Sequence, residues 1–358
     1  MTDVSLFWRD KNAAAGVSGT GLTETTLGLA AAGVNCLYDQ FLLPISNNRR
    51  GFVLRGTTYI KLLEPLTGGG HKHRVFGTDE DLTFAYAEQK LDTGTSFQAG
   101  KDYYIYLVAP QPDTDGGADL VVSLNSTFPS GYTADNSRKI GGFHTLCVGV
   151  GTIASHPLSG MVAGDIIPAS MWDLLHRPTC SPEGMAYVEP LHFWADIYLQ
   201  SGNGAATVSA FGGTCTDNQI WAAHVEDLFS VGKTLLTDSE FACCMEGSNQ
   251  KTAIAGATDA VTTGGHLDTA GRRMISSYGL EDGCGFMNQW LDNPSANGGS
   301  SWTTQTGGKG DLYGTSCALL AGGSWINGAD CGSRCRYADN SRLSVYAIVG
   351  GRGRASSR

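Results

Sequence analysis

Apolar residues in the first part of the chain occur in short runs of the residue types that favour β-strands. Residues 51–62 (GFVLRGTTYIKL) and 101–108 (KDYYIYLV) are rich in β-branched and aromatic residues, and the second is the clearest strand. Glycine and proline turn signals stand at 116–117 and 129–131. Short strands with frequent turns favour a β-sandwich or a β-prism up to about residue 155.

The pattern changes in the second half of the chain. Residues 168–175 predict a short connecting helix, which Pro178 stops, and 192–199 predict a strand. A longer helix follows, because four apolar residues recur at helical spacing and share one face: Trp221, Val225, Leu228 and Phe229.

A second helix begins with the sequence Thr237-Asp238-Ser239-Glu240. This is a capping box, in which the threonine accepts a hydrogen bond from the amide three residues on and the glutamate reaches back. One face of this helix is apolar and carries Phe241, Cys244 and Met245. After Gly247 the chain is mostly Gly, Ser, Thr and Asn, which predicts a loop-rich region whose loops carry the function.

Composition agrees with a globular, β-rich protein. The 358 residues are 41% hydrophobic and only 16% charged, and 49 of them are glycine, about twice the usual share. The net charge of −10 argues against nucleic-acid binding, which needs a basic surface. No apolar run is long enough to insert into a membrane, and no signal peptide is predicted at the start. The ten cysteines are therefore expected to be made in a reducing cytosol, most of them as small buried side chains.

Few motifs suggest catalysis. The chain has no nucleophile elbow, no dinucleotide fingerprint and no P-loop. His71-Lys72-His73 has the spacing of a metal chelate, but we interpret it as an exposed loop, which could also lie on a trimer axis. Cys331 and Cys335 lie among arginines that would lower thiol pKa values, so a reactive cysteine pair is one interpretation. The other interpretation is that one cysteine is buried and the other lies in an exposed loop.

Arginines recur near the carboxyl end, where Asp339 alone opposes them. A phosphate-binding patch is one interpretation. We favour a scaffold role, in which guanidinium groups hold loops by binding carbonyls and carboxylates. The arginines assigned to this role are Arg334, Arg336, Arg342 and Arg352.

Four segments in a fixed order resemble the formylglycine-generating-enzyme type of C-type lectin fold. They are the helix start at 235–241, the segment 278–290 (YGLEDGCGFMNQW), the strand at 321–325 (AGGSW) and the closing Gly-Gly-Arg at 350–352. One branch of this fold oxidises cysteine with two cysteines placed just after the G-G-S-W strand. In this chain Asn327 stands where the first of them belongs, so the sequence departs from the oxidase pattern.

The other branch comprises the variable proteins of diversity-generating retroelements, which include phage tail-fibre proteins. The chain looks very like this branch at 322–325, 331–337, 340–342 and 350–354. Segments 128–132 and 139–144 also resemble tail-fibre proteins. The resemblance implies an α+β chain with a β-rich stalk or assembly region over 1–165 and a C-type lectin-like ligand-binding domain over 166–358.

The resemblance also implies a mechanism. A partner reverse transcriptase would rewrite the codons of the C-terminal loops, so that fixed residues hold the loops and changeable residues face solvent. The fixed frame would comprise Gly322, Gly323, Trp325 and Gly332 with the four arginines. The changeable, ligand-binding set would comprise Ile326, Asn327, Ala329, Asp330, Cys335, Asp339, Asn340, Leu343, Ser344 and Tyr346. An ordinary strand over 343–346 with Leu343 buried remains an alternative.

The resemblance thus implies a non-enzymatic receptor-binding protein of a virion tail fibre, made in the host cytoplasm and expected to form a homotrimer. Its partner would be a protein or glycan of the host surface, and no cofactor is expected. The sequence leaves a structural calcium ion open. The alternatives are a cysteine oxidase, a calcium lectin, although neither Glu-Pro-Asn nor Gln-Pro-Asp occurs, and a bacterial surface display protein with the same domain.

Overall fold

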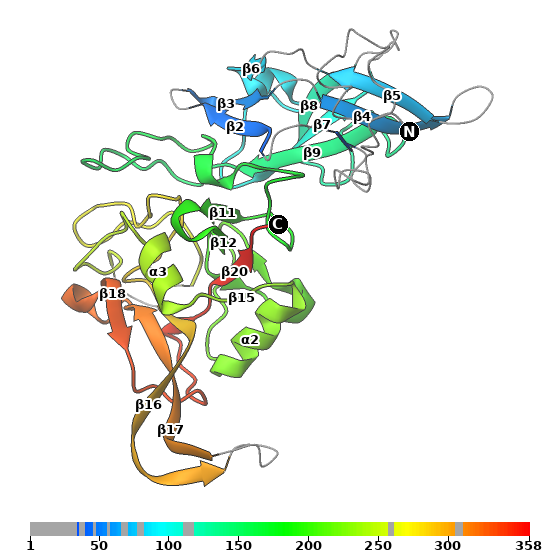
Figure 1. Cartoon of the computed structure of the whole chain (residues 1–358). Coiled ribbons are helices and arrows are strands. Elements are labelled where there is room, and N and C mark those ends of the chain that lie inside the picture. The colour runs from blue at the N-terminus through cyan, green and yellow to red at the C-terminus, as the bar shows by residue number, and fades with distance from the viewer. Residues whose placement is uncertain are drawn as a thin grey trace. The chain divides into compact units, whose positions relative to one another are not determined.

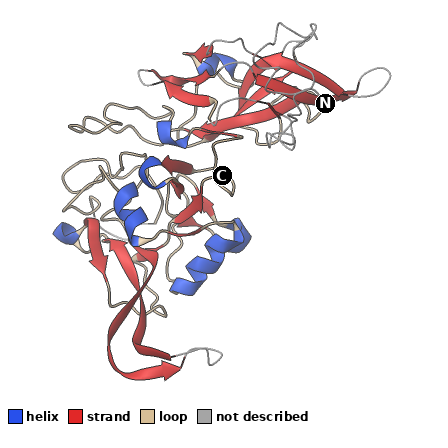
Figure 2. Ribbon diagram, in the orientation of Figure 1, coloured by secondary structure: helices blue, strands red, loops and turns tan. Residues whose placement is uncertain are grey.

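The chain forms two compact units, and each unit is built from several separate stretches of the sequence (Figure 1). The computed structural model describes residues 34–35, 40–45, 48–55, 58–65, 71–76, 82–109, 118–256, 261–304 and 311–358. Unit 1 holds the described residues up to Phe97 together with Asp102–Phe143 and Met171–Arg177, and unit 2 holds Gln98–Lys101, His144–Ser170 and Pro178–Arg358. The domain boundary expected after residue 165 stays a prediction. Strands predominate in both units and helices are few (Figure 2).

Unit 1 consists of three small sheets. Their orders are β1-β4-β5, β2-β3-β6 and β10-β9-β7-β8. The strands are β1 (Val34–Asn35), β2 (Leu42–Ile45), β3 (Asn48–Leu54), β4 (Thr58–Pro65), β5 (His71–Phe76), β6 (Leu82–Phe84), β7 (Asp102–Val108), β8 (Asp119–Ser123), β9 (Ser137–His144) and β10 (Trp172–Asp173), with a 3-10 turn at η2 (Ala87–Lys90). Aromatic rings fill the core, where Phe143 packs against Phe52, Phe97 and Tyr103.

Most sequence predictions for unit 1 are confirmed. The strand expected over 101–108 is β7, and 51–62 form parts of two strands, β3 and β4. The turn at 129–131 is present, since the Tyr132 amide donates to the Pro129 carbonyl at 3.1 Å. The turn expected at 116–117 lies outside the described residues.

Two predictions for this part of the chain are wrong. The expected loop at His71-Lys72-His73 is the beginning of β5, which pairs with β4. The pairing could not be predicted, because a short polar segment shows no apolar pattern of a strand. The helix expected over 168–175 is only a 3-10 turn, η3 (Pro168–Ser170), followed by β10. β10 pairs with Gly141 and Gly142 of β9, where a side chain on Gly141 would begin 2.4 Å from the Trp172 carbonyl oxygen.

Unit 2 is built on two four-stranded sheets and two helices. The sheet orders are β11-β12-β20-β15 and β18-β17-β16-β19, and β13 pairs with β14. The elements are β11 (Met185–Val188), η4 (Glu189–Leu191), β12 (Phe193–Asp196), β13 (Gln200–Ser201), η5 (Gly204–Ala206), β14 (Val208–Ser209), α2 (Trp221–Ser230), β15 (Thr234–Leu235), α3 (Asp238–Cys244), β16 (Asn288–Thr304), β17 (Asp311–Gly322), η7 (Gly328–Asp330), β18 (Gly332–Tyr337), β19 (Val349–Gly350) and β20 (Gly353–Ser356).

Helix α3 follows the sequence prediction. The Glu240 amide donates to the Thr237 hydroxyl oxygen at 3.4 Å, and the Glu240 carboxylate accepts from the Thr237 amide at 2.8 Å, so the capping box is formed. Phe241, Cys244 and Met245 are all buried. The box therefore fixes where the helix begins and directs its apolar face into the core of unit 2.

Helix α2 follows the prediction in part. Trp221, Val225 and Leu228 face the cluster formed by Trp290 of β16 and Leu320 of β17. Phe229 is 77% exposed, so its placement on that face was wrong. One residue past Leu228 is about 100° further around the helix, which turns Phe229 into solvent.

Two further predictions need correction. The strand expected over 192–199 is shorter, because β12 ends at Asp196. The region after Gly247 is not purely loops, since β16 and β17 form a long antiparallel hairpin (Figure 1). Its sequence is mostly small and polar, and therefore lacks the alternation that predicts a strand. Among the described helices, none has the length and apolar character needed to cross a membrane.

Candidate functional site

The predicted site begins where β17 ends in a turn that only glycine can form. Gly322 and Gly323 have φ angles of +88° and +80°. A Cβ atom on Gly322 would lie 2.6 Å from the Gly283 carbonyl oxygen, and one on Gly323 would lie 2.8 Å from the Cys331 sulfur. The backbone therefore crosses two other segments at a distance that excludes every side chain.

Trp325 anchors the next part of the turn. Its amide donates to the Phe286 carbonyl at 3.1 Å, and its ring packs against a buried cluster that includes Phe286 and Met287. The Asn327 amide oxygen accepts from both the Ser324 amide (2.8 Å) and the Ser324 hydroxyl (2.7 Å). Asn327 was predicted among the ligand-binding residues, but these bonds use its side chain to close the turn.

The other predicted ligand-binding residues lie on three consecutive segments: the η7 turn, strand β18 and the loop after it. Ile326, Ala329, Asp330, Asp339, Leu343 and Tyr346 are exposed, while Cys335, Asn340 and Ser344 are half-buried. We call the outward-facing residues of 326–346 the display surface.

Pairing to one strand keeps these segments together. β18 is the edge strand of its sheet, with Arg336 opposite Ala321 and Tyr337 opposite Leu320 of β17. Beyond β18 the chain continues along the same strand, since Ser341 bridges to Cys317. The display surface therefore follows the side of β17 that pairs with β18 and Ser341, and it is not scattered over the unit.

The alternative of an ordinary strand over 343–346 is wrong. These residues belong to no strand, and Leu343 is 75% exposed, so it is not part of the core. Val345 and Tyr337 are also exposed, although the sequence prediction did not include them in the ligand-binding set. Tyr337 ends β18 beside the half-buried Arg336, and burial does not alternate along this strand, so no strand period could have identified it.

Three of the four predicted scaffold arginines hold the frame. Arg352 is fully buried and donates to the carbonyls of Asp196 and Ile197, both at 2.8 Å, and to the Gln289 side chain at 2.9 Å. It thus ties the chain after β19 to β12 and β16. A buried guanidinium needs this many acceptors to offset the loss of water.

Arg336 and Arg342 hold the display surface from beneath. Arg336 pairs with the Asp238 carboxylate at the start of α3 and lies 5.1 Å from the centre of the Phe241 ring. Arg342 donates to the Cys317 carbonyl at 3.1 Å and stacks 4.5 Å from the Trp221 ring of α2. Arg334 differs, because its side chain is exposed on β18.

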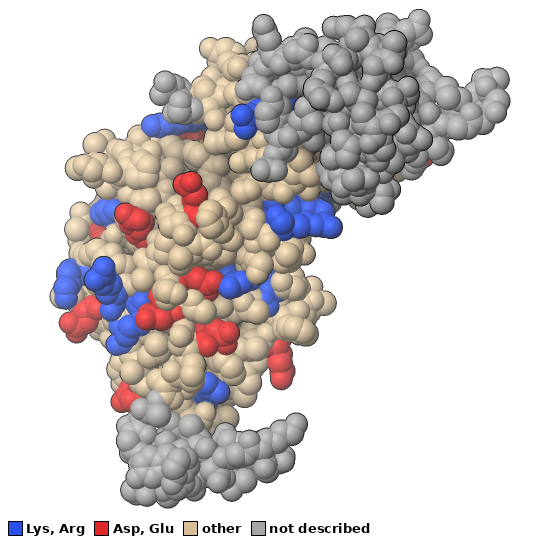
Figure 3. Space-filling model, in the orientation of Figure 1, with Lys and Arg blue, Asp and Glu red and all other residues tan. Residues whose placement is uncertain are grey.

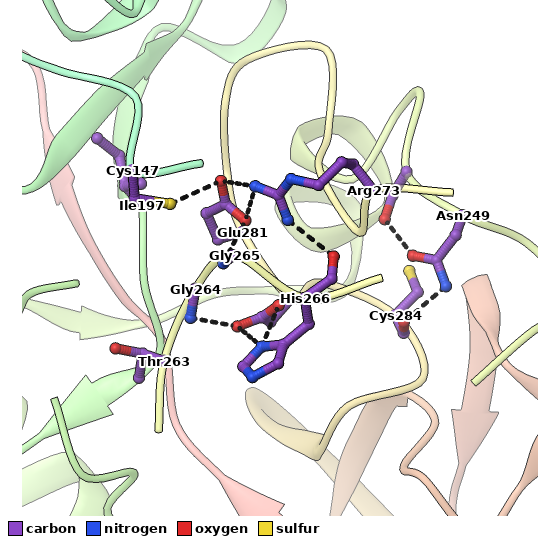
Figure 4. A network of polar contacts seen from close by, with 12 residues as sticks. Cys147, Ile197, Asn249, Thr263, Gly264, Gly265, His266, Arg273, Glu281 and Cys284 are labelled. Atoms are coloured by element: carbon purple, nitrogen blue, oxygen red, sulfur yellow. Dashed lines mark hydrogen bonds and ion pairs between the residues drawn. The ribbon is translucent and has the colours of Figure 1, made fainter. Parts of the chain in front are cut away.

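A buried ion-pair network supports the segment 278–290 (Figure 4). Arg273 binds both carboxylate oxygens of Glu281 at 2.6 and 2.8 Å, and the Cys147 thiol donates to the same carboxylate at 3.4 Å. The neighbouring Asp282 carboxylate accepts from the Gly264 amide at 2.5 Å and contacts the His266 ring at 3.1 Å. Sequence reasoning missed this network, since its members come from separate segments of the chain.

The cysteines near the site are not a reactive pair. Burial raises the pKa of the Cys331 thiol to about 11, and burial also raises the pKa of Cys335 in spite of the nearby Arg336 and Lys251 charges. Arg336 lowers the pKa of Cys335 as expected, but the net lowering expected for the pair is wrong, because desolvation outweighs the charge. All nine cysteines of the described residues are free, and most are buried.

The described residues also contain no group of three or more His, Cys, Asp or Glu side chains arranged to hold a metal ion. The Asn293 side-chain oxygen of β16 accepts from the Asp238 amide at 2.6 Å and so helps to hold the start of α3.

Comparison with known proteins finds similar sequences. The family model described as Mtd second domain matches residues 57–173. The tail fiber receptor-binding protein of Bordetella phage BPP-1 is 31% identical over 287 residues, which cover 73% of this chain and 72% of that protein.

The solved structures with similar folds are variants of the Major Tropism Determinant. The Major Tropism Determinant M1 variant matches with a TM-score of 0.71 at 25% identity and covers 91% of this chain and 86% of its own. The P3c variant matches with a TM-score of 0.72 at 25% identity, over 96% of this chain and 90% of its own.

The fold is mostly β-sheet with few helices and matches the C-type lectin-like fold of the tropism determinants. The chain belongs to the major tropism determinant family of phage tail-fibre proteins. The relatives are receptor-binding determinants by name, and none of these matches supports the cysteine oxidase alternative.

Proposed function

We propose that this chain is a receptor-binding protein of a phage tail fibre, which recognises a molecule on the host cell surface through the display surface. Its place would be the virion. Residues 1–165 would serve as the stalk or assembly region and 166–358 as the ligand-binding domain. The family relationship supports this assignment, because the named relatives are tail-fibre receptor-binding and tropism-determining proteins.

The observation that carries the proposal is the concentration of exposed apolar side chains on one short segment. Of the fifteen large hydrophobic side chains that are exposed among the described residues, five lie within 326–346: Ile326, Tyr337, Leu343, Val345 and Tyr346. Exposed apolar groups that gather in one place mark interaction sites more often than single ones do. Tyrosine is also a frequent energetic centre of protein interfaces.

The direct test is adsorption of the purified protein to cells of the host from which the phage or prophage comes. Replacing Tyr346 by Ala should reduce adsorption about tenfold or more, as removal of an interface tyrosine does, and leave the unfolding temperature unchanged. Phe229→Ala is the matched control, because Phe229 is an exposed aromatic residue of α2 outside the display surface. Equal adsorption of Tyr346→Ala and the unaltered protein would contradict the assignment.

We further propose that the codons of the display surface are rewritten by a retroelement. Outward-facing positions tolerate substitution, typically within about 0.5 kcal/mol in either direction, whereas Gly322, Gly323 and Arg352 do not have this freedom. Sequencing of the neighbouring DNA tests this. It should contain a reverse transcriptase gene and an imperfect repeat of the 3′ coding region that differs mainly at adenines, and a locus with neither would overturn the proposal.

A homotrimer is the expected assembly, since several copies on one fibre would strengthen weak single contacts. Sedimentation velocity of the full chain should give the mass of three copies. A monomer at micromolar concentration would contradict this proposal without affecting the assignment of the display surface.

A further inference from the structure

A lysine outside the C-terminal segment lies beside the display surface in a backbone conformation that lysine rarely adopts. Lys251 has a φ angle of +61°, in the left-handed region, and its side chain is exposed. Glycine occupies this region without steric cost, whereas a residue with a Cβ atom is strained there. Such strain at an exposed loop position calls for a reason that lies in the side chain.

The loop that carries Lys251 is fixed to the start of β18. The Lys251 amide donates to the Cys331 carbonyl at 2.8 Å. The side chain of the preceding Gln250 accepts from the Ser333 amide at 3.1 Å and donates to the Ser333 hydroxyl at 3.2 Å. A Cβ atom on Gly332 would lie 2.4 Å from the Gln250 side-chain oxygen, so the glycine predicted as scaffold is needed for this contact. Lys251 therefore keeps its position whatever the neighbouring outward residues are.

The ammonium group of Lys251 is close enough to the display surface to act on it electrically. It lowers the pKa of the Cys335 thiol, although burial, the larger effect, raises that pKa overall. Within the described part of the chain, no carboxylate forms an ion pair with Lys251. Figure 3 shows Lys and Arg side chains in the region of β18, with Asp and Glu side chains among them.

We propose that Lys251 is a constant receptor contact, which binds a carboxylate of the host receptor at the margin of the display surface. This inference rests on the proposed function. Lys251 lies outside the segment 322–354 that resembles the retroelement branch, so the same cation would accompany every set of changeable side chains. On the display surface, the exposed side chains of Ile326, Leu343 and Val345 have no hydrogen-bonding groups, which favours a protein carboxylate over that of a hydroxyl-rich polysaccharide.

Charge-specific substitutions test this inference in adsorption assays with host cells. Lys251→Gln should weaken adsorption about tenfold at low salt, with the difference shrinking as salt is added, because an exposed charge contact is screened. Lys251→Arg should retain adsorption. Lys251→Gly should lose adsorption while raising the unfolding temperature, since it relieves the backbone strain. If the lysine were purely structural, adsorption and the unfolding temperature would change in the same direction. Lys90→Gln, at an exposed lysine of η2, is the matched control.

The outcomes separate this inference from the proposed function. If Tyr346→Ala loses adsorption and Lys251→Gln equals the unaltered protein at every salt concentration, the inference about Lys251 is wrong and the display surface stands. If neither substitution reduces adsorption, the proposed function itself fails. Treating the host cells with protease should remove the Lys251-dependent part of adsorption, and its survival would overturn the assignment to a protein carboxylate.

Discussion

At the scale of single residues, the display surface depends on a few positions whose geometry permits no substitute. Gly323 combines a left-handed backbone with a Cβ position 2.8 Å from the Cys331 sulfur. Gly328, in the same turn region, has a φ angle of +53° but open space where a Cβ atom would lie. Substituting Gly323 would therefore cause both a steric clash and backbone strain, whereas substituting Gly328 would cause backbone strain alone.

We expect Gly323→Ala to lower the free energy of unfolding by about 2–4 kcal/mol, because overpacking adds to the strain. Gly328→Ala should cost only about 1 kcal/mol, since strain acts alone there. Urea denaturation of both variants measures the difference. Equal losses would show that the close approach to Cys331 does not constrain the turn.

A buried histidine makes the stability of unit 2 depend on pH. His224 of α2 is fully buried, its Nδ1 lies 2.8 Å from the Gln200 side-chain oxygen, and burial lowers its pKa from 6.5 to about 4. The folded protein therefore keeps this ring neutral where the unfolded chain takes up a proton. Its contribution to stability is complete above pH 6.5 and is lost as the pH falls toward 4.

The corresponding prediction compares the protein with His224→Gln across this range. The unaltered protein should lose about 3 kcal/mol of unfolding free energy relative to the variant between pH 7 and pH 4. Only the difference between the two is informative, because burial raises the pKa of Asp173 in unit 1 to about 6, which acts in the opposite direction. Parallel stability curves would contradict a neutral buried His224.

At the scale of secondary-structure elements, the helices of unit 2 position the display surface. Arg342 spans from the loop after β18 to the Trp221 ring at the start of α2, and the Trp221 amide donates back to the Arg342 carbonyl at 3.0 Å. Arg336 makes the equivalent link from β18 to α3. Strand β18 and the loop after it are thus each held by one arginine and one helix.

Arg342→Met should release the loop after β18 without unfolding the unit. We expect a loss of about 1–2 kcal/mol, from the stacking on Trp221 and the hydrogen bond to the Cys317 carbonyl. Hydrogen exchange should accelerate in the amides of 339–346 and stay unchanged in α3. Acceleration across the whole of unit 2 would instead assign Arg342 to global stability.

The sequence predicted these elements unevenly, for physical reasons. Helix α3 was predictable because a capping box and an apolar face are both local. The glycine turn was recognised through family resemblance, and the arginine frame through the wide spacing of the arginines along a loop-rich segment. Phe229 was misplaced because a one-residue step changes the helix face. β16 and β17 were missed because mutual pairing, not apolar alternation, makes them strands, and the Arg273–Glu281 pair needed three-dimensional proximity.

At the scale of the whole molecule, the chain separates what must stay constant from what can change. Buried groups such as Arg352 and Glu281 fix the frame through hydrogen bonds that no other side chain would satisfy. The exposed residues of the display surface contribute little to that frame. This separation would allow one fold to carry many binding specificities.

The most direct test replaces the four exposed side chains Ile326, Leu343, Val345 and Tyr346 by serine together and measures adsorption of the folded protein to host cells. The account predicts an unfolding temperature close to that of the unaltered protein, because each exposed position contributes within about 0.5 kcal/mol, and a loss of adsorption of about a hundredfold or more. A folded variant that still adsorbs within about twofold of the unaltered protein would show that the host is bound elsewhere.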